Sequence, residues 1–162
     1  MNNKKKVALV KGDNRKDNIK KCLTLIKEDL EPIRNAKNIL IKPNLVALKP
    51  DFANTHVEAI EAVIEFIREI APDTPITVGE SSASAFYKKL PTTKVFEDYD
   101  YYRLEKKYQK VTLTDFDNDK DVTESPILSV VGDTHLRITK RIEEFDYKIS
   151  LAIPKTHNFA VA

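Results

Sequence analysis

Short aliphatic runs and longer amphipathic stretches alternate along this chain. The aliphatic runs occupy residues 7–10, 39–41, 76–78, 111–114 and 149–153. Between the second and third runs, apolar residues recur at helical spacing from Val57 to Ile70, which predicts an amphipathic helix. A similar spacing predicts an earlier helix that Asp17 or Asn18 caps and that continues to about Ile33. This order of strands and helices favours an α/β fold, in which right-handed crossovers give a mostly parallel sheet covered by helices.

The second half of the chain is less regular. A short helix is predicted within residues 96–107. Gly132 and Asp133 lie between extended runs at 127–131 and 134–139, and two such residues between extended runs predict a hairpin. We therefore expect one α/β domain over the whole chain, residues 1–162, whose sheet is either entirely parallel or mixed through an antiparallel addition.

The composition is that of an ordinary globular domain. With 162 residues, 41% of them hydrophobic, the chain is long enough to bury a core without disulfides or a structural metal. Its 27 basic and 25 acidic residues are well mixed and leave a net charge of +2, so the sequence indicates no nucleic-acid partner. No apolar run approaches the roughly 20 residues of a membrane span, so we expect no membrane partner and a cytoplasmic location.

Cys22 is the only cysteine of the chain. A single thiol excludes an intrachain disulfide, and it cannot build an iron–sulfur cluster or a zinc site from four thiolates. Cys22 shares an apolar helical face with Ile19, Leu23 and Ile26, so we interpret it as a packing residue. We therefore expect no iron–sulfur cluster in this chain.

Three of the aliphatic runs stop abruptly in polar and charged residues. The residues that follow them are Lys42, Pro43 and Asn44; Gly79, Glu80, Ser81 and Ser82; and Pro154, Lys155, Thr156 and His157. The carboxyl ends of parallel strands lie at one edge of a sheet, where open α/β sheets bind their ligands. We therefore predict a site for a small anionic ligand at this edge. The ligand-binding residues predicted from these segments are Lys42, Asn44, Ser81 and Ser82.

The two lysines at strand ends, Lys42 and Lys155, have alternative interpretations. Each either holds a phosphate or carboxylate or acts as a base whose pKa burial lowers. Alternatively, each is a structural lysine whose stem packs at the strand end while its ammonium group reaches water. Ser81 and Ser82 likewise either contribute to an anion site or cap the helix that follows them.

The start of the helix at residues 57–70 is a further candidate for anion binding. Thr55 is followed by Glu58 three positions later, a pattern typical of a capping box. Unpaired N–H groups and the helix dipole favour negative charge at such a terminus, so Thr55 and His56 are predicted to bind the ligand. The alternative for His56 is a purely structural role.

His157 is the histidine that we predict to be catalytic, because it follows Lys155 at the mouth of the sheet. Lys155 and Glu80 complete the predicted catalytic set. Glu80 is either the acid or base companion of His157 or the ion-pair partner of Lys42. His135, within the predicted hairpin, is expected to be a surface residue.

The sequence identifies neither a metal nor a cofactor. The aspartates at residues 115, 117, 119 and 121 alternate like the first ligands of a calcium loop. Such a loop also needs Gly at its sixth position and Glu at its twelfth, where this chain has Lys120 and Pro126, so a solvated loop is the favoured interpretation. Three glycines in the whole chain leave no Walker loop and no dinucleotide fingerprint.

Several of these segments also carry a family resemblance. They are Val7–Lys11, Ile39–Val46, Asn54–His56, Val78–Ser82 and Ile153–His157. In this order they resemble the uncharacterised family filed as domain of unknown function 362. The resemblance implies no settled activity, and the ferredoxin-like segment that some members add is absent from this sequence. Family chains continue past the last segment, so the resemblance implies that this chain is truncated at its carboxyl end.

Two functional hypotheses follow from the sequence. The first is a small-anion site at the strand ends, in a protein that is either a binding protein or part of an enzyme of unknown reaction. The alternative is a non-catalytic module that docks an interaction or redox partner. Because residues 159–162 form an apolar segment with nothing after it, we also expect homo-oligomers that associate through this segment.

Overall fold

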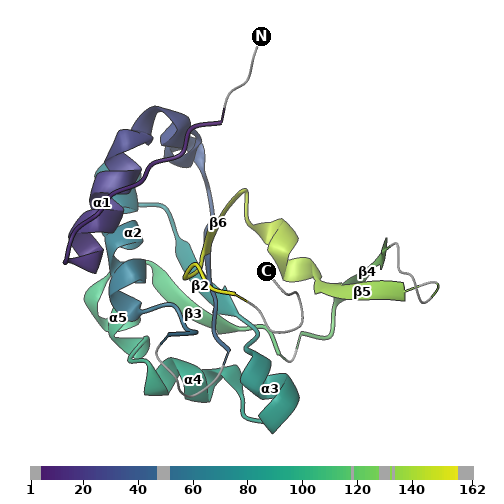
Figure 1. The fold of residues 1–162 in the computed structure, drawn as a ribbon. Coiled ribbons are helices and arrows are strands. Elements are labelled where there is room, and N and C mark those ends of the chain that lie inside the picture. The colour runs from purple at the N-terminus through teal and green to yellow at the C-terminus, as the bar shows by residue number, and fades with distance from the viewer. Residues whose placement is uncertain (1–4, 47–51, 118, 128–131, 133, 157–162) are drawn as a thin grey trace.

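Four parallel strands form the sheet at the centre of the molecule. The structure is a computed structural model that describes residues 5–46, 52–117, 119–127, 132 and 134–156. The strands are β1 (Ile39–Pro43), β2 (Ile76–Glu80), β3 (Val111–Asp115) and β6 (Tyr147–Leu151), in the order β3-β2-β1-β6. Helices cover one face, and a separate antiparallel pair lies on the other side (Figure 1). The predicted single α/β domain with a parallel sheet and an antiparallel addition is confirmed.

Two helices, α1 (Arg15–Leu25) and α2 (Val57–Ile70), lie side by side on the covered face (Figure 1). Ile60, Ile64 and Ile67 of α2 are buried in one core with Ile41 and Val78 of the sheet. The helical periodicity in the sequence therefore identified α2 correctly. In the part of the chain that the structure describes, no helix is long and apolar enough to cross a membrane.

Shorter elements complete the fold. They are η1 (Lys27–Asn35), α3 (Ala83–Lys88), α4 (Thr92–Asp98), α5 (Tyr102–Lys107), β4 (Val122–Ile127), β5 (Thr134–Thr139) and η2 (Lys140–Glu144). The single helix predicted within 96–107 is in fact two helices, α4 and α5. Asp100 lies between them with a φ of 57°, a left-handed conformation that no α-helix continues through.

The strand register aligns the carboxyl ends of the sheet. Ile41 lies opposite Val78 of β2 on one side and opposite Ile149 of β6 on the other. In the same register, Pro43 at the end of β1 lies opposite Leu151 at the end of β6. The polar segments that follow these strands therefore leave the sheet at one common edge.

The second face of the sheet is partly polar and only partly covered. Leu40 and Lys42 point to this face because they alternate with the core residues of β1. The ring of Phe116 packs directly on Gly79, where a Cβ atom would lie 2.4 Å from the ring. Glycine is therefore required at this position for the close approach of Phe116.

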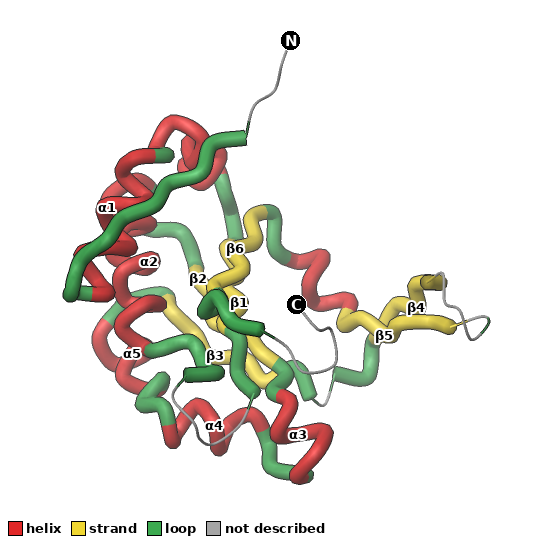
Figure 2. The backbone as a smooth tube through the Cα atoms, viewed as in Figure 1, coloured by secondary structure: helices red, strands yellow, loops and turns green. Residues whose placement is uncertain are grey.

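The predicted strand at residues 7–10 is wrong. Residues 5–12 form no helix or strand and run along the outside of α1, away from the sheet (Figure 2). Val7 and Leu9 are 90% and 92% exposed in this position. Since β1 already has β2 and β6 as its neighbours, no place beside β1 is left for a first strand.

The boundaries of the first helix also differ from the prediction. Its N-cap is Asn14, whose Oδ1 accepts a hydrogen bond from the N–H of Asp17 at 3.0 Å, so neither Asp17 nor Asn18 is the cap. The α-helix ends at Leu25 and the 3-10 segment η1 follows. Pro32 lies within η1 and has no N–H to donate to an α-helical hydrogen bond, so a regular helix cannot continue to Ile33.

A hairpin is present, as predicted, but its register excludes the predicted two-residue turn at residues 132–133, which would place residue 131 opposite Thr134. Strands β4 and β5 pair antiparallel, with Val122 opposite Thr139 and Ile127 opposite Thr134. The first strand lies earlier than predicted, because β4 ends at Ile127, and residues 128–131 are outside the described residues. His135 on β5 is exposed, as the sequence indicated.

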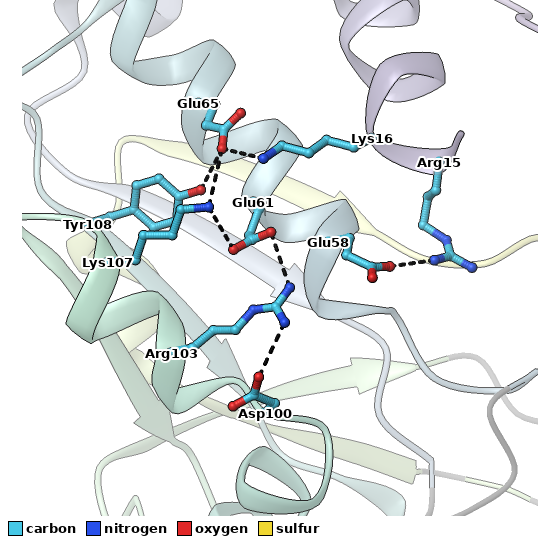
Figure 3. Close-up of polar contacts among 9 residues, drawn as sticks. All are labelled: Arg15, Lys16, Glu58, Glu61, Glu65, Asp100, Arg103, Lys107 and Tyr108. Atoms are coloured by element: carbon cyan, nitrogen blue, oxygen red, sulfur yellow. Dashed lines mark hydrogen bonds and ion pairs between the residues drawn. The ribbon is translucent and has the colours of Figure 1, made fainter. Parts of the chain in front are cut away.

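An ion-pair network joins α2 to its neighbours (Figure 3). Glu65 of α2 accepts a hydrogen bond from Lys16 of α1 at 2.5 Å and another from the hydroxyl of Tyr108 at 2.7 Å. One turn earlier, Glu61 accepts a hydrogen bond from Arg103 of α5 at 3.1 Å. The network fixes the outer face of α2 against α1 and α5.

Candidate functional site

The structure divides the predicted site between two hollows. Lys42 and Ser81 line a hollow of about 390 Å³ on the second face of the sheet, under the hairpin. Thr55, His56 and Lys155 line a larger pocket of about 710 Å³ on the helical face. We call these the hairpin hollow and the α2 pocket. His157 lies outside the described residues.

Glu80 and Lys42 form an ion pair at the end of β2 and β1. Glu80 Oε2 accepts a hydrogen bond from Lys42 Nζ at 2.5 Å, and Glu80 Oε1 accepts one from the N–H of Leu45 at 3.4 Å. Burial raises the pKa of Glu80 to about 7, although Lys42 and the Leu45 N–H act in the opposite direction. This carboxyl group can therefore gain or lose a proton near neutral pH, a property typical of an acid–base group.

Lys42 is half exposed and points its ammonium group across the end of its own strand. Besides Glu80, its Nζ donates to the backbone oxygen of Pro43 at 3.2 Å. Lys42 is thus the ion-pair partner of Glu80, one of the alternatives given for Glu80, and it also lines the hairpin hollow.

The two serines after β2 make different contacts at the start of α3. Ser81 Oγ donates to Asp117 Oδ1 at 2.8 Å, and Asp117 Oδ2 accepts from the N–H of Thr92 at 2.9 Å. Ser82 is the N-cap residue of α3, but its side chain makes no capping hydrogen bond. Its backbone N–H donates to Thr92 Oγ1 at 2.7 Å. These contacts attach the start of α3 to the start of α4 and to the loop after β3.

Thr55 connects three segments through one buried hydroxyl. Its Oγ1 accepts a hydrogen bond from the N–H of Asn44 at 2.9 Å and donates to the oxygen of Leu151 at 2.7 Å. Asn44 is fixed in turn, because its Nδ2 donates to the oxygen of Ala53 at 2.8 Å. The predicted capping box is therefore wrong: His56, not Thr55, is the N-cap of α2. Thr55 and Asn44 position the edge of the α2 pocket.

The α2 pocket lies where α1, the start of α2 and the chain after β6 meet. Its lining residues are Arg15, Ile19, Phe52, Thr55, His56, Ala59, Leu151, Ala152, Ile153, Pro154, Lys155 and Thr156. His56 is half-buried, and its side chain makes no capping hydrogen bond to the first turn of α2. Among the described residues, no side chain caps the first N–H groups of α2 beside the pocket.

Arg15 is a pocket residue that the sequence analysis missed. Its Nη1 lies 2.6 Å from Glu58 Oε2, and this pair lies at the start of both α1 and α2 (Figure 3). Phe52, also missed, is 85% exposed at the pocket. No pattern in the sequence relates α1 to the end of β6, and an exposed aromatic residue in a loop was the only available signal for Phe52.

The aspartates after β3 do not form a metal site in the described part of the chain, where no group of three or more His, Cys, Asp or Glu residues is suitably placed for a metal ion. The two carboxylate oxygens of Asp117 accept hydrogen bonds from Ser81 Oγ and from the N–H of Thr92. Asp119 Oδ2 accepts a hydrogen bond from Thr139 Oγ1 at 2.5 Å. The solvated-loop interpretation is also incomplete, because these two carboxylates fasten the loop to neighbouring elements.

Comparison with known proteins gives one match. A family model described as "Domain of unknown function (DUF362)" matches residues 39–162. The match includes the segments after β1, β2 and β6, whereas the resemblance noted at Val7–Lys11 lies outside it. No curated protein and no solved structure matches the chain.

Proposed function

The chain belongs to the DUF362 family, whose description names no activity, and we propose that it binds a small organic anion in the α2 pocket. The observation that carries this proposal is the meeting of Arg15, His56 and Lys155 around one pocket, from three separate parts of the chain. The uncapped amino terminus of α2 adds N–H groups and the positive end of the helix dipole.

The charge around the pocket supports an anionic ligand. Glu58, the one carboxylate in the first turn of α2, is paired with Arg15. Lys155 makes no ion pair or hydrogen bond with any other described residue, so its ammonium group is available to a ligand. A carboxylate or phosphate between Lys155, His56 and the start of α2 would therefore meet positive potential.

The remaining lining is apolar and supports an organic ligand rather than an inorganic ion. Ile19, Ala59 and Leu151 contribute aliphatic surface, and Phe52 offers an exposed ring. A pocket of about 710 Å³ lies within the range of roughly 300–1,000 Å³ that small-molecule sites occupy. We therefore expect a ligand with a charged head and an apolar or aromatic body.

The test is a binding screen on the purified chain. Thermal unfolding would be followed with inorganic phosphate, short hydroxy acids and aromatic carboxylates, because a ligand at 100 times its Kd stabilises the native state by about 2.7 kcal/mol. Stabilisation by an organic anion, with little effect of inorganic phosphate, is the expected result.

Matched variants assign the binding to the pocket. His56→Ala and Lys155→Ala should each weaken binding about tenfold or more, because each removes a group that contacts a charged ligand. His135→Ala on the hairpin and Lys148→Ala on β6 are the controls and should bind normally. Equal affinity in all four variants would contradict the proposal.

Catalysis is the finer part of the hypothesis. Lys155 lines the α2 pocket, and His157 follows it by two residues, so we propose these two residues for proton transfer to or from the bound ligand. Glu80 does not line this pocket. We propose that Glu80, by gaining or losing its proton, instead sets the net charge of the Lys42–Glu80 ion pair beside the hairpin hollow.

One observation favours docking of another protein chain as a second function. Ile127, Leu136 and Ile138 are all partly exposed, and the strand pairing of the hairpin places them on one face. A two-stranded hairpin is marginally stable alone, so a partner that covers this face would stabilise it. Sedimentation of the wild type and of Leu136→Ser over a range of concentrations tests self-association through this face.

A further inference from the structure

Two features of the molecule have no role in the proposed function. One is the exposed aliphatic segment Val7–Val10, and the other is the outer edge of β6. Residues 5–11 make no backbone–backbone hydrogen bond with other described residues, although the segment is extended. Val7 and Leu9, at alternate positions, are 90% and 92% exposed. Ala8 and Val10, at the other alternate positions, are partly buried, so the segment keeps only part of its aliphatic surface from water.

The polar contacts that hold the segment on α1 and η1 are weak. Lys6 pairs with Glu28 at 3.2 Å and with Asp29 at 3.3 Å, and all three side chains are exposed. Cys22 Sγ lies 3.8 Å from the oxygen of Ala8. Exposed ion pairs and a thiol contact contribute little to stability, so leaving this position costs mainly the partial burial of Ala8 and Val10.

The outer edge of β6 offers unpaired backbone groups. The N–H of Tyr147 donates to the oxygen of Asn38, so the peptide groups of Tyr147, Ile149 and Leu151 face β1. Successive peptide groups of a strand alternate, and those of Lys148 and Ser150 therefore face outward. Lys148 does not shield this edge, because its Nζ donates to the oxygen of Phe145. Tyr147 and Ile149 are only partly buried against the core.

The opposite edge of the sheet differs. On β3, the N–H of Leu113 donates to Glu105 Oε1 of α5 at 2.8 Å, and α5 packs beside this strand. A side chain thus occupies the β3 edge, whereas none of the described residues occupies the β6 edge. Of the two free edges, β6 is the one that can accept another strand.

We propose that residues 7–10 dock along β6 as a fifth parallel strand of the same molecule. Arg15 and Ile19 of α1 line the α2 pocket together with Leu151 and Pro154, so the start of α1 already lies near the end of β6. A strand that ends at residue 10 would reach α1 through residues 11–14, a connection of ordinary length. Such a strand would run in the same direction as β6.

Crossover handedness selects the same edge. α1 and α2 lie on one face of the sheet, and α2 connects β1 to β2, the neighbour on the β3 side. A crossover from a strand beyond β6 through α1 to β1 moves across the sheet in the same direction, so it has the same hand. A strand added beside β3 would give the opposite hand, which parallel crossovers almost never have.

Docking would stabilise both residues 7–10 and strand β6. With Val7 and Leu9 on the helical face of the sheet, docking would remove these side chains from water and place Ala8 and Val10 on the other face. It would also pair the outward peptide groups of Lys148 and Ser150. It would also cover the exposed parts of Tyr147 and Ile149. The inference concerns the sheet alone and does not depend on a ligand in the α2 pocket.

Hydrogen exchange of the full chain tests the inference. The outward amides of Lys148 and Ser150 should exchange slowly in the wild type and at least tenfold faster in Leu9→Gln. Leu25→Gln is the matched control, because Leu25 is also exposed, at 65%, but lies on α1. In the surface position Leu9→Gln would change nothing, since Leu9 contacts solvent there.

A second variant examines the other partner. Ser150→Pro removes an outward N–H of β6 without removing a hydrogen bond to β1, so the sheet should remain folded while the amides of residues 7–10 lose their protection. Three results would overturn the inference. They are unprotected Lys148 and Ser150 amides in the wild type, equal protection in Leu9→Gln, and protection that rises with protein concentration, which would assign the strand to a second copy.

Discussion

Lys42 Nζ and Glu80 Oε2 are 2.5 Å apart, yet one residue of this pair is half exposed and the other is 5% exposed. The lysine therefore keeps most of its hydration, whereas the carboxylate loses nearly all of its own. An ion pair with one buried member is costly to break by removing the exposed member, because the buried charge is then left without compensation.

The first prediction concerns the pH dependence of stability. The pKa of Glu80 is raised from 4.5 to about 7 by burial, so the native state binds the proton more tightly than the unfolded chain. The contribution of this group to stability is therefore complete below about pH 4.5 and is lost as the pH rises to about 7. Urea unfolding should be followed from pH 4.5 to 8. Over this range the free energy of unfolding of the wild type should fall by up to about 3 kcal/mol relative to that of Glu80→Gln. A constant difference between the two proteins would contradict this prediction.

The second prediction is that Lys42→Met destabilises the protein by about 1–3 kcal/mol at pH 8, where Glu80 is charged, and by much less at pH 5, where it is protonated. Chemical unfolding at both pH values measures this. Lys94→Met is the control, because Lys94 Nζ is also 2.5 Å from its partner, Glu97, but both residues are exposed. Its cost should stay below about 1 kcal/mol at either pH.

The third prediction concerns the network on α2. Burial pushes the pKa of Glu65 upward, but hydrogen bonds from Lys16, Lys20 and Tyr108 together lower it to about 2. Because the folded pKa lies below the unfolded value of 4.5, this group stabilises the protein above about pH 4.5, and the contribution is lost as the pH falls to about 2. Glu65→Gln should cost about 1–2 kcal/mol at pH 7 and almost nothing at pH 2. Glu69→Gln, an exposed change on the same helix, should be neutral at both.

The fourth prediction tests the clamp formed by Thr55. Thr55→Val keeps the shape of the side chain but leaves the Asn44 N–H and the Leu151 oxygen without their partner, at a cost of about 2–4 kcal/mol. Thr112→Val on the exposed β3 edge should be neutral or slightly stabilising, since valine favours strands. If both variants unfold at the same denaturant concentration, the hydroxyl of Thr55 contributes nothing to the fold.

The fold could be predicted from the sequence wherever local pattern decides the structure. The stripe from Val57 to Ile70 and the run at 39–41 specify their elements through their own periodicity and β-propensity. The prediction was wrong where distant contacts decide. Thr55 carries a capping-box pattern, but its hydroxyl donates a hydrogen bond to the oxygen of Leu151, which is 96 positions away in the chain. The strand-like run at 7–10 lies outside the sheet, and β6, from the far end of the chain, occupies the place beside β1.

The common edge of the candidate site could also be predicted, since parallel strands all end there. The side of the sheet that each residue faces could not be predicted. Lys42 and Lys155 both follow apolar runs, yet they line hollows on opposite faces. Arg15 was missed because its proximity to Lys155 depends on how α1 packs on α2, and residue spacing carries no information about that packing.

The placement of β6 beside β1 also determines the order of assembly. Strands β1 and β2 are joined by α2 and can associate early, whereas β6 reaches β1 only when Asp146 meets Asn38, 108 positions away along the chain. Closing so long a loop costs conformational entropy before any favourable contact can compensate for it. We therefore expect β6 to dock after the main folding barrier. The α2 pocket, which needs the end of β6, is then among the last parts to form. A ligand bound there should slow unfolding and leave the refolding rate unchanged.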